Sequence, residues 1–473
     1  MANQSQESYQ KHPSSSPSSS VVVVVVPFPL QSHLNQLLQL SHVISSHNIP
    51  VHYLSSALHI SQVKSRVIHV VNQERIQFHD FPTPHFLSPP PNDTKFQSHL
   101  LPSFEASVES LREPFADLLT SLSVTARKVV VIHDPLTSSV VHDSCRFPNA
   151  EVYAFHCVSS LLDAAYIRET LGIQIGNDDC KLGNIPSFEG TITPDLLAFT
   201  AYQNQFATKI KKSGHVYNTC RLIESQFLDL MLKIERERNE DVKMWAIGPL
   251  ETVTFFKNRL NGSQHKCLEW LDKQRPNSVL YVSFGTTTFM EDEQIRELAL
   301  GLEQSEVNFL WVLRDADKGN VFDEVRRPQL PDRFEERVRE KGMVVRDWAP
   351  QLEILGHNST GGFMSHCGWN SCLESMSLGV PIAAWPMYGD QPINEVLIID
   401  VLKVGVLGRN WTRKDEIVSS SVISEVVKKL MDSEEGDEVG KRTEKFGNEL
   451  REATADGGVS RIELDSFIAH ISR

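Results

Sequence analysis

The sequence predicts an α/β protein with two doubly wound, Rossmann-like domains that face each other across a cleft. Its 473 residues suit two domains of about 200 residues each. Apolar runs with the length and composition of buried parallel strands alternate with helical segments in both halves of the chain. The stretch 248–266 separates the two sets, and we interpret it as the linker. Open sheets of this kind bind ligands beyond the carboxyl ends of their strands.

The N-terminal half begins with a strand–helix–strand unit. We expect residues 1–20, which are polar and rich in serine, to be a disordered tail, and residues 21–247 to form the first domain. The six valines from Val21 to Val26 predict a fully buried parallel strand, and a helix runs onward from His33. Further strands are predicted at 49–55, 127–134 and 150–156, and a proline-rich loop at 81–94.

The C-terminal half repeats this organisation, and we assign its domain to residues 267–455. A helix is predicted from Glu291. After the turn Asp456–Gly458 the pattern predicts an amphipathic helix, and we expect the segment 456–473 to pack back on the first domain. Strands are predicted at 278–285, 308–314, 343–347, 361–366 and 380–386.

Composition excludes several classes of protein. With 46 basic and 60 acidic residues the formal charge is -14, which argues against binding to nucleic acid or to an anionic membrane. The apolar run ending at Val26 is far shorter than the roughly 20 residues of a membrane span, and no export signal precedes it. The seven cysteines are odd in number and scattered, which predicts reduced thiols in a cytoplasmic protein. The sequon at Asn261 is then an unused surface turn.

The stretch from Trp348 to Gln391 contains neither lysine nor arginine, yet it has the parts of an anion site. Its strand end at His366 is followed by a turn at Gly368 and the start of a helix. The free N–H groups and positive dipole end of a helix bind phosphate without a cation. Asn370 and Ser371 add neutral donors there. Taken alone, an Asn-Ser pair of this kind is more often an ordinary helix cap.

This whole span resembles the C-terminal signature of the plant family 1 UDP-sugar glycosyltransferases. The resemblance implies the GT-B fold, UDP-glucose as co-substrate, and no cofactor or metal. It also implies that the first domain binds the acceptor and the second the UDP-sugar. Trp348 would stack on uracil, with the Ala349 backbone and Gln351 reading the base edge and ribose. By the same resemblance, His366, Asn370 and Ser371 would bind the diphosphate, and Glu374 would bind the ribose. Trp369 would contact the sugar or the diphosphate, and Asp390 and Gln391 would bind the sugar hydroxyls.

Glu374 also has an independent interpretation, and Thr286 is a further candidate for the donor site. Glu374 lies three residues after Ser371, which is the spacing of a capping box. Thr286 follows a predicted strand and begins a second strand-to-helix turn, from which it could reach the β-phosphate. Read alone, this second turn is a weak motif.

An alcohol attacks an anomeric carbon only if a base takes its proton, and histidine is the usual base. His33 follows the first strand and matches the catalytic histidine of the family, although Ser32 and Gln36 replace the usual Gly and Pro. Asp134 ends another strand and matches the family's aspartate, which orients the base. His133 competes by position, but strand alternation turns it the other way. Direct displacement would invert the anomeric carbon.

Rival functions explain fewer of these features. A glycoside hydrolase using Glu374 and Asp390 leaves the helix start and Trp348 unexplained. A hydrolase using Cys367 beside His366 is disfavoured because adjacent residues at a strand end point apart. A non-catalytic UDP-sugar sensor would not need both His33 and Asp134.

The sequence suggests an acceptor only through resemblance. Stretches such as VVVVPFPLQSHLNQLLQLSHVISSHNIPVHY resemble the zeatin O-glucosyltransferase and O-xylosyltransferase branch of the family. This implies transfer to the side-chain hydroxyl of zeatin-type cytokinins, with flavonoids or terpenoids as alternative acceptors and UDP-xylose as an alternative donor. We expect the acceptor pocket to draw on 81–91 and on Phe155 and His156. No obligatory protein partner is evident.

Overall fold

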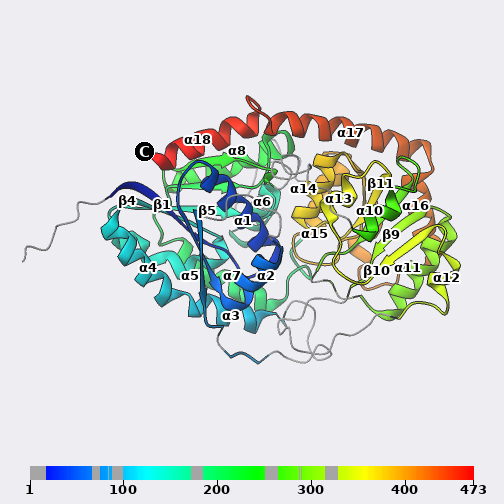
Figure 1. Ribbon diagram of the computed structural model, residues 1–473, viewed down its shortest axis with the longest axis horizontal. Helices are drawn as coiled ribbons and strands as arrows, with labels where there is room; N and C mark the ends of the chain where they lie inside the picture. The colour runs from blue at the N-terminus through cyan, green and yellow to red at the C-terminus, as the bar shows by residue number, and fades with distance from the viewer. Residues whose placement is uncertain are drawn as a thin grey trace, which may run out of the picture.

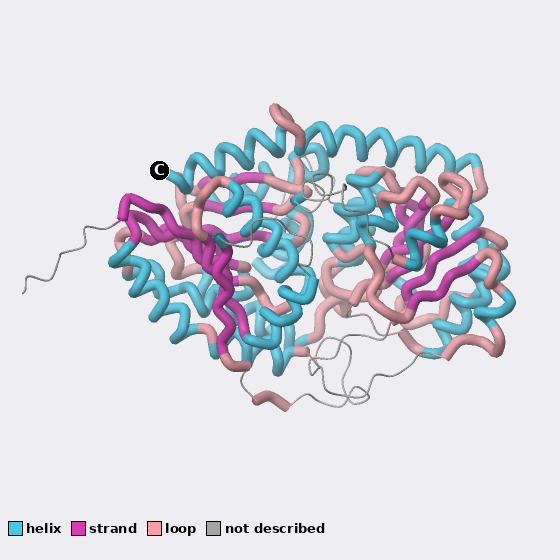
Figure 2. The backbone as a smooth tube through the Cα atoms, in the orientation of Figure 1, coloured by secondary structure: helices cyan, strands magenta, loops and turns pink. Residues whose placement is uncertain are grey.

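A computed structural model describes residues 18–66, 75–83, 85–87, 98, 100–171, 185–250, 265–286, 288, 290–314 and 329–473. It has two α/β domains, each built on one parallel sheet with helices packed on both faces (Figures 1 and 2). The predicted fold class is confirmed. Most of the predicted linker, residues 251–264, lies outside the described part of the chain, as do the sequon at Asn261 and much of the proline-rich stretch 81–94.

The N-terminal sheet has seven strands in the order β3-β2-β1-β4-β5-β6-β7. They are β1 Ser18–Val26, β2 Val51–Ser56, β3 Ile76–Phe81, β4 Ala126–His133, β5 Ala150–His156, β6 Gly214–Tyr217 and β7 Lys243–Ala246. The helices of this domain are α1 Gln31–Ser46, α2 Ala57–Arg66, α3 Leu101–Ser110, α4 Arg112–Thr125, α5 Ser138–Val141, α6 Ser160–Leu171, α7 Pro194–Ala207 and α8 Arg221–Arg238, with short 3-10 turns η2 Pro135–Thr137 and η3 His142–Arg146.

The C-terminal sheet has six strands in the order β10-β9-β8-β11-β12-β13. They are β8 Val279–Ser283, β9 Asn308–Val312, β10 Gly342–Val345, β11 Thr360–Ser365, β12 Ile382–Ala384 and β13 Gly405–Leu407. The remaining helical elements are α10 Lys266–Leu271, α11 Asp292–Ser305, α12 Phe334–Arg337, α13 Gln351–Leu355, α14 Trp369–Leu378, α15 Gln391–Val396, η4 Leu397–Val401, η5 Trp411–Arg413, α16 Ser420–Met431, α17 Glu434–Thr454 and α18 Val459–Ser472.

Both sheets reverse their winding direction beside their first strand. The reversal lies between β1 and β4 in the N-terminal sheet and between β8 and β11 in the C-terminal sheet. At such a switch point the loops after the two neighbouring strands diverge, and the crevice between them is where doubly wound sheets bind ligands. The register pairs Val26 with His133 and Ser365 with Ser283, so the segments that follow these strands start side by side.

The valine run forms the central strand of the first domain, as its composition predicts. Val22, Val24 and Val26 pack on one face of the sheet, and Val23 and Val25 pack on the other. Helices cover both faces, so neither set reaches solvent. β1 begins at Ser18, three residues before the predicted start of the domain. The short or half-exposed strands β3, β6, β7 and β13 were not predicted, because they carry too few apolar residues to stand out.

The C-terminal segment returns to the first domain. The long helix α17 runs along the second domain and continues, after the turn Asp456–Gly458, into α18, which lies over the first (Figure 1). Phe467 of α18 is fully buried against Tyr153 and Trp245. None of the described helices combines the length and the apolar character that a membrane span requires.

A buried carboxylate links α8 to the first turn of α6. Glu224 is fully buried at a kink in α8, and its Oε1 accepts a hydrogen bond from the Leu161 N–H at 2.9 Å. Burial raises the pKa of Glu224 from 4.5 to about 7. Because the folded state binds this proton more tightly than the unfolded state, Glu224 favours folding most below pH 4.5, and this contribution is lost as the pH rises through 7.

We therefore expect Glu224→Gln to lose this pH dependence. The wild-type protein should become less stable relative to the variant by about 3 kcal/mol as the pH rises across this window. Midpoints of thermal denaturation, measured at several pH values, would show the gap between the two proteins changing. Glu237→Gln, at an exposed position of the same helix, is the matched control and should follow the wild type. A constant gap for Glu224→Gln would contradict the assignment.

Candidate active site

One cavity of about 1030 Å³ lies between the domains and is lined by both of them. Every catalytic and donor-binding residue that the sequence predicts borders it: His33, Asp134, Thr286, Trp348, Ala349, Gln351, His366, Trp369, Asn370, Ser371, Glu374, Asp390 and Gln391. They come from loops and helix starts that follow β1, β4, β8, β10, β11 and β12. The two switch points therefore open into the same space.

A buried histidine–aspartate pair lies on the N-terminal side of the cavity. His33 Nδ1 is 2.6 Å from Asp134 Oδ2, and these two residues are 9% and 1% exposed. The other carboxylate oxygen accepts the Leu136 N–H at 2.8 Å. Burial alone would raise the pKa of Asp134, but His33 and the Leu136 N–H hold it below its usual value. An ionised Asp134 fixes the proton of His33 on Nδ1 and leaves Nε2 as the basic nitrogen.

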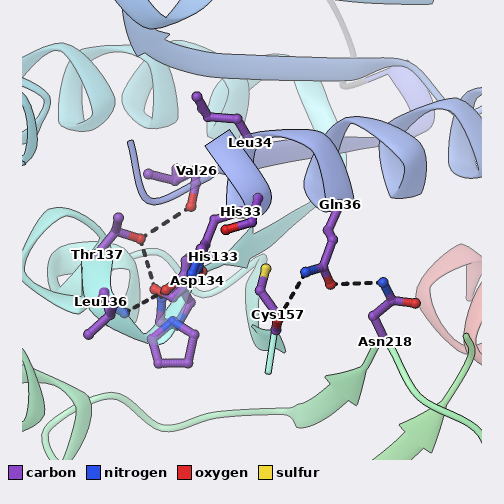
Figure 3. A network of polar contacts seen from close by, with 12 residues as sticks. Val26, His33, Leu34, Gln36, His133, Asp134, Leu136, Thr137, Cys157 and Asn218 are labelled. Carbon is purple, nitrogen blue, oxygen red and sulfur yellow. Dashed lines mark hydrogen bonds and ion pairs between the residues drawn. The ribbon is translucent and has the colours of Figure 1, made fainter. Parts of the chain in front are cut away.

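Backbone pairing between β1 and β4 places this aspartate. The Asp134 N–H donates to the carbonyl of Val26 at 3.1 Å, and the Thr137 hydroxyl contacts the carbonyls of both residues (Figure 3). The competing His133 is fully buried, and its Nδ1 lies 2.8 Å from the carbonyl of Asp134. Burial lowers the pKa of His133 to about 3. His133 does not border the cavity, as strand alternation predicts.

Gln36, which replaces the usual proline of the family pattern, bonds α1 to two other segments of the first domain. Its side chain is fully buried, and its amide donates to the Cys157 carbonyl at 2.8 Å. Its oxygen accepts the side-chain amide of Asn218 at 2.8 Å (Figure 3). These two bonds attach the helix that carries His33 to the carboxyl ends of β5 and β6.

Cys157 lies close to the histidine–aspartate pair. Its Sγ and the donor atoms of His33 and Asp134 all lie within 4.8 Å of one another, the one such group found among the described residues. A tetrahedral zinc ion would hold two of its ligands roughly 3.3 Å apart. The 2.6 Å contact between His33 and Asp134 is shorter, and it is the distance of a shared proton.

The turn between β11 and α14 builds the predicted anion site in an unexpected way. Gly368, the N-cap of α14, has an ordinary φ of -60°, and the left-handed residue is Cys367 with a φ of 65°. The glycine is needed for space, because a Cβ there would lie 2.6 Å from His366 Nε2. A Cβ at Gly285, on the opposite loop, would lie 2.7 Å from the same atom. The imidazole of His366 is thus held between two glycines.

Burial lowers the pKa of His366 to about 4, so the ring is neutral at pH 7. Its Nδ1 is buried and has no hydrogen-bond partner among the described residues. The sequence also missed a cation at this cavity: Arg314, just after β9, is among the lining residues. Its position two residues beyond a strand's carboxyl end was the available signal.

Gln351 and Glu374 form a polar cluster on the wall of the cavity, which Trp348 also lines. The Gln351 amide donates to the Glu374 carboxylate at 2.6 Å and to the Ser371 hydroxyl at 3.0 Å. The Tyr281 hydroxyl in turn donates to Gln351 at 3.2 Å. Trp348 is 55% exposed, which is unusual for a tryptophan and leaves a flat face for an aromatic ligand.

Asp390 and Gln391 lie at the start of α15. Burial raises the pKa of Asp390, against hydrogen bonds from the Asn394 side chain and the Trp369 backbone. Gln391 is 3% exposed, and its oxygen accepts the backbone N–H groups of Met387 and Tyr388 at 2.8 and 3.1 Å. The amide nitrogen of Gln391 is therefore the group that can donate to a ligand.

Two of the residues predicted to bind the UDP-sugar form hydrogen bonds between the two domains. The indole N–H of Trp369 donates to the Asn218 carbonyl at 3.0 Å, and the amide of Asn370 donates to the Ser32 carbonyl at 3.2 Å. Trp369 is 3% exposed and packs in a core shared with the first domain. Its direct contact with a sugar remains a prediction.

The acceptor-pocket residues were predicted less well. His156 borders the cavity, but its neighbour Phe155 points into the core and is fully buried. None of the described residues of 81–91 lines the cavity, and Phe81 is partly buried against the core instead. The side chains that do line this end come largely from α3, α6 and α7, for which the sequence carries no motif: Leu100, Phe104, Leu162, Asp163, Tyr166, Phe188, Ile192, Leu196, Thr200 and Asn204.

The glycine contacts generate a sharp test of the anion site. Gly368→Ala places a methyl group against the His366 ring and should weaken binding of UDP by roughly 5- to 150-fold, since a misplaced donor costs about 1–3 kcal/mol. Isothermal titration with UDP measures the affinity. Gly440→Ala, whose new Cβ would meet nothing within 4 Å, is the matched control and should bind UDP normally. Unchanged affinity in Gly368→Ala would show that His366 does not contact the nucleotide.

Comparisons with known proteins agree with this geometry. Residues 19–252 match the family model of the glycosyltransferase N-terminal domain, and residues 260–435 match that of UDP-glucoronosyl and UDP-glucosyl transferases. The chain is 50% identical to a zeatin O-xylosyltransferase of Phaseolus vulgaris, over 96% of this chain and 98% of the relative. It is 49% identical to a zeatin O-glucosyltransferase of Phaseolus lunatus, over 96% and 97% of the two chains.

A solved structure shows the same arrangement. A Medicago truncatula UGT complexed with UDP-glucose superposes with a TM-score of 0.73 at 27% identity, covering 96% of this chain and 99% of that one. The family models match most of the chain, and the two zeatin enzymes align with nearly all of it. This protein therefore belongs to the UDP-glycosyltransferase family and is a glycosyltransferase with the GT-B fold.

Proposed function

We propose that the enzyme transfers glucose from UDP-glucose to the side-chain hydroxyl of a zeatin-type cytokinin, with inversion at the anomeric carbon. The observation that carries the acceptor is the 50% and 49% identity, over nearly full length, to two enzymes named for zeatin. The acceptor end of the cavity suits such a molecule, because its lining combines apolar side chains with a few polar ones. The UDP-sugar is a co-substrate, and we place the reaction in the cytoplasm.

In this mechanism His33 is the general base. The acceptor hydroxyl gives its proton to Nε2 as its oxygen attacks the anomeric carbon, and Asp134, 2.6 Å from Nδ1, stabilises the imidazolium that forms. UDP leaves from the opposite face of the sugar, so a single displacement inverts the configuration. The helix start at Gly368 and the neutral donors around it receive the negative charge of the departing diphosphate.

The donor residues keep the roles expected from the family pattern. Trp348 stacks on uracil, Glu374 accepts the ribose hydroxyls, and Asp390 and Gln391 hold the sugar. In the structure the Glu374 carboxylate accepts a 2.6 Å hydrogen bond from the Gln351 amide. When the ribose binds, its hydroxyls must either replace this hydrogen bond or share the carboxylate with Gln351. Ser371, which accepts from Gln351, keeps its own hydroxyl proton for a phosphate oxygen.

UDP-xylose is the second candidate donor. The relative at 50% identity is a xylosyltransferase and the one at 49% a glucosyltransferase, so similarity alone does not separate the two sugars. Gln391 can donate to sugar hydroxyls that both donors possess. UDP-glucose is preferred because glutamine at this last position of the signature is typical of glucose donors.

The test is a panel of transfer reactions followed by mass spectrometry. UDP-glucose and UDP-xylose are each incubated with trans-zeatin, cis-zeatin, dihydrozeatin, a flavonol and a terpenoid alcohol. We expect a hexose on a zeatin-type acceptor. A pentose on zeatin would show that UDP-xylose is the donor and would support the proposed acceptor. Products from the flavonol or the terpenoid alone would contradict the proposed acceptor.

A further inference from the structure

The acceptor end of the cavity contains one carboxylate that the mechanism does not use. Among the described residues of the N-terminal domain, two acidic ones border the cavity, and one of them, Asp134, is hydrogen-bonded to His33. The other is Asp163, in the first turn of α6. Around it the wall is mainly apolar, with Leu162, Tyr166 and Phe188 among the lining residues.

Two aromatic residues hold this carboxylate in place. Asp163 Oδ2 accepts the Tyr217 hydroxyl at 2.8 Å and lies 2.7 Å from His156 Nδ1. The rings of His156 and Tyr217 stack at 4.0 Å, nearly parallel at 9°. Behind them His156 Nε2 lies 2.9 Å from His215, which is 3.5 Å from Glu235. A carboxylate that is hydrogen-bonded by the Tyr217 hydroxyl and lies against His156 is preorganised toward the cavity.

The second oxygen of Asp163 has acceptor capacity left over. Oδ1 makes no hydrogen bond to a described residue, and the side chain is 22% exposed. A carboxylate has no proton of its own to donate, so an oxygen facing an apolar pocket selects a ligand that brings an N–H or O–H group.

Asp163 is also tied to the sugar end of the site. The Ser159 hydroxyl, just before α6, donates to the side-chain oxygen of Asn394 at 2.9 Å. Asn394 in turn donates to Asp390 at 2.8 Å. The position of α6 is thus fixed relative to the residue proposed to hold the sugar.

We propose that Asp163 accepts a hydrogen bond from an N–H group of the acceptor's adenine ring. This inference rests on the proposed function and refines it. Zeatin is an adenine whose exocyclic nitrogen carries a hydroxylated isoprenoid chain, so the molecule has N–H groups at its ring end and the reacting hydroxyl at the other. Asp163 holds the ring while the chain carries the hydroxyl to His33. A terpenoid alcohol has no ring N–H and gains nothing from Asp163.

The first test is Asp163→Asn, which keeps the shape and an acceptor oxygen for Tyr217 but removes the charge. A hydrogen bond to a charged group is worth about 10–100-fold in affinity. We expect the KM for trans-zeatin to rise by that factor, with kcat and the KM for the UDP-sugar nearly unchanged. A merely structural role would change all three. Asp229→Asn, an exposed aspartate on α8, is the matched control and should leave the kinetics unchanged.

The second test uses the unaltered enzyme. Adenine should compete with trans-zeatin, and 6-dimethylamino-9-methylpurine, which lacks every N–H, should compete at least about tenfold more weakly. Equal competition by the two purines, or an unchanged zeatin KM in Asp163→Asn, would overturn the role of Asp163 while the zeatin activity stands. Absence of any transfer to zeatin by the wild-type enzyme would overturn the proposed function and this inference with it.

Discussion

The hydrogen bonds of Asn218 hold together the parts of the chain on which the site depends. This residue is 1% exposed, and its backbone N–H donates to His156 at 3.2 Å while its carbonyl accepts from Trp369 at 3.0 Å. Its side chain donates to Gln36 at 2.8 Å and accepts from Leu250 at 3.0 Å. One residue at the end of β6 thereby connects the base-bearing helix α1, the segment leading out of the first domain, and the start of α14. Each polar group of this buried residue makes a hydrogen bond, so Asn218 contributes to how the two domains face each other.

That fixed geometry suits a reaction between two separately bound substrates. The first domain presents His33 and Asp134, and the second presents a helix start, a neutral histidine and an exposed tryptophan. The chain as a whole carries a formal charge of -14, so the phosphate site that we propose would rely on oriented N–H groups, and Arg314 is a cation among the residues that line the same cavity. In the proposed mechanism, preorganised dipoles need little rearrangement when the charge on UDP develops.

Much of the architecture and of the donor site could be predicted from the sequence, because the decisive signals are local. The valine strand, the strand end at His366 and the helix beginning at Trp369 each lie within a few consecutive residues. His33 and Asp134 are 101 residues apart, yet both follow buried strands, and parallel neighbours in one sheet bring such ends together.

What the sequence could not reveal depends on contacts between distant segments. The role of Gln36 requires Cys157 and Asn218, which are 121 and 182 residues away. The need for Gly368 comes from crowding by His366, and its φ of -60° leaves the left-handed turn to Cys367. Asp163 looks like an ordinary acidic residue in the first turn of a helix until Tyr217 and His156 are placed beside it.

The most direct measurement of the central claim, that His33 is the base of a site shared by both domains, is the turnover of His33→Ala alongside its affinity for UDP. General-base catalysis typically accelerates a reaction about 10²–10⁴-fold. The kcat of the variant should therefore fall at least about 100-fold, while UDP binds as tightly as to the wild type. His47→Ala, at the C-cap of the same helix, controls for changes to α1 and should remain active. Turnover of His33→Ala within a few fold of the wild type would contradict the account.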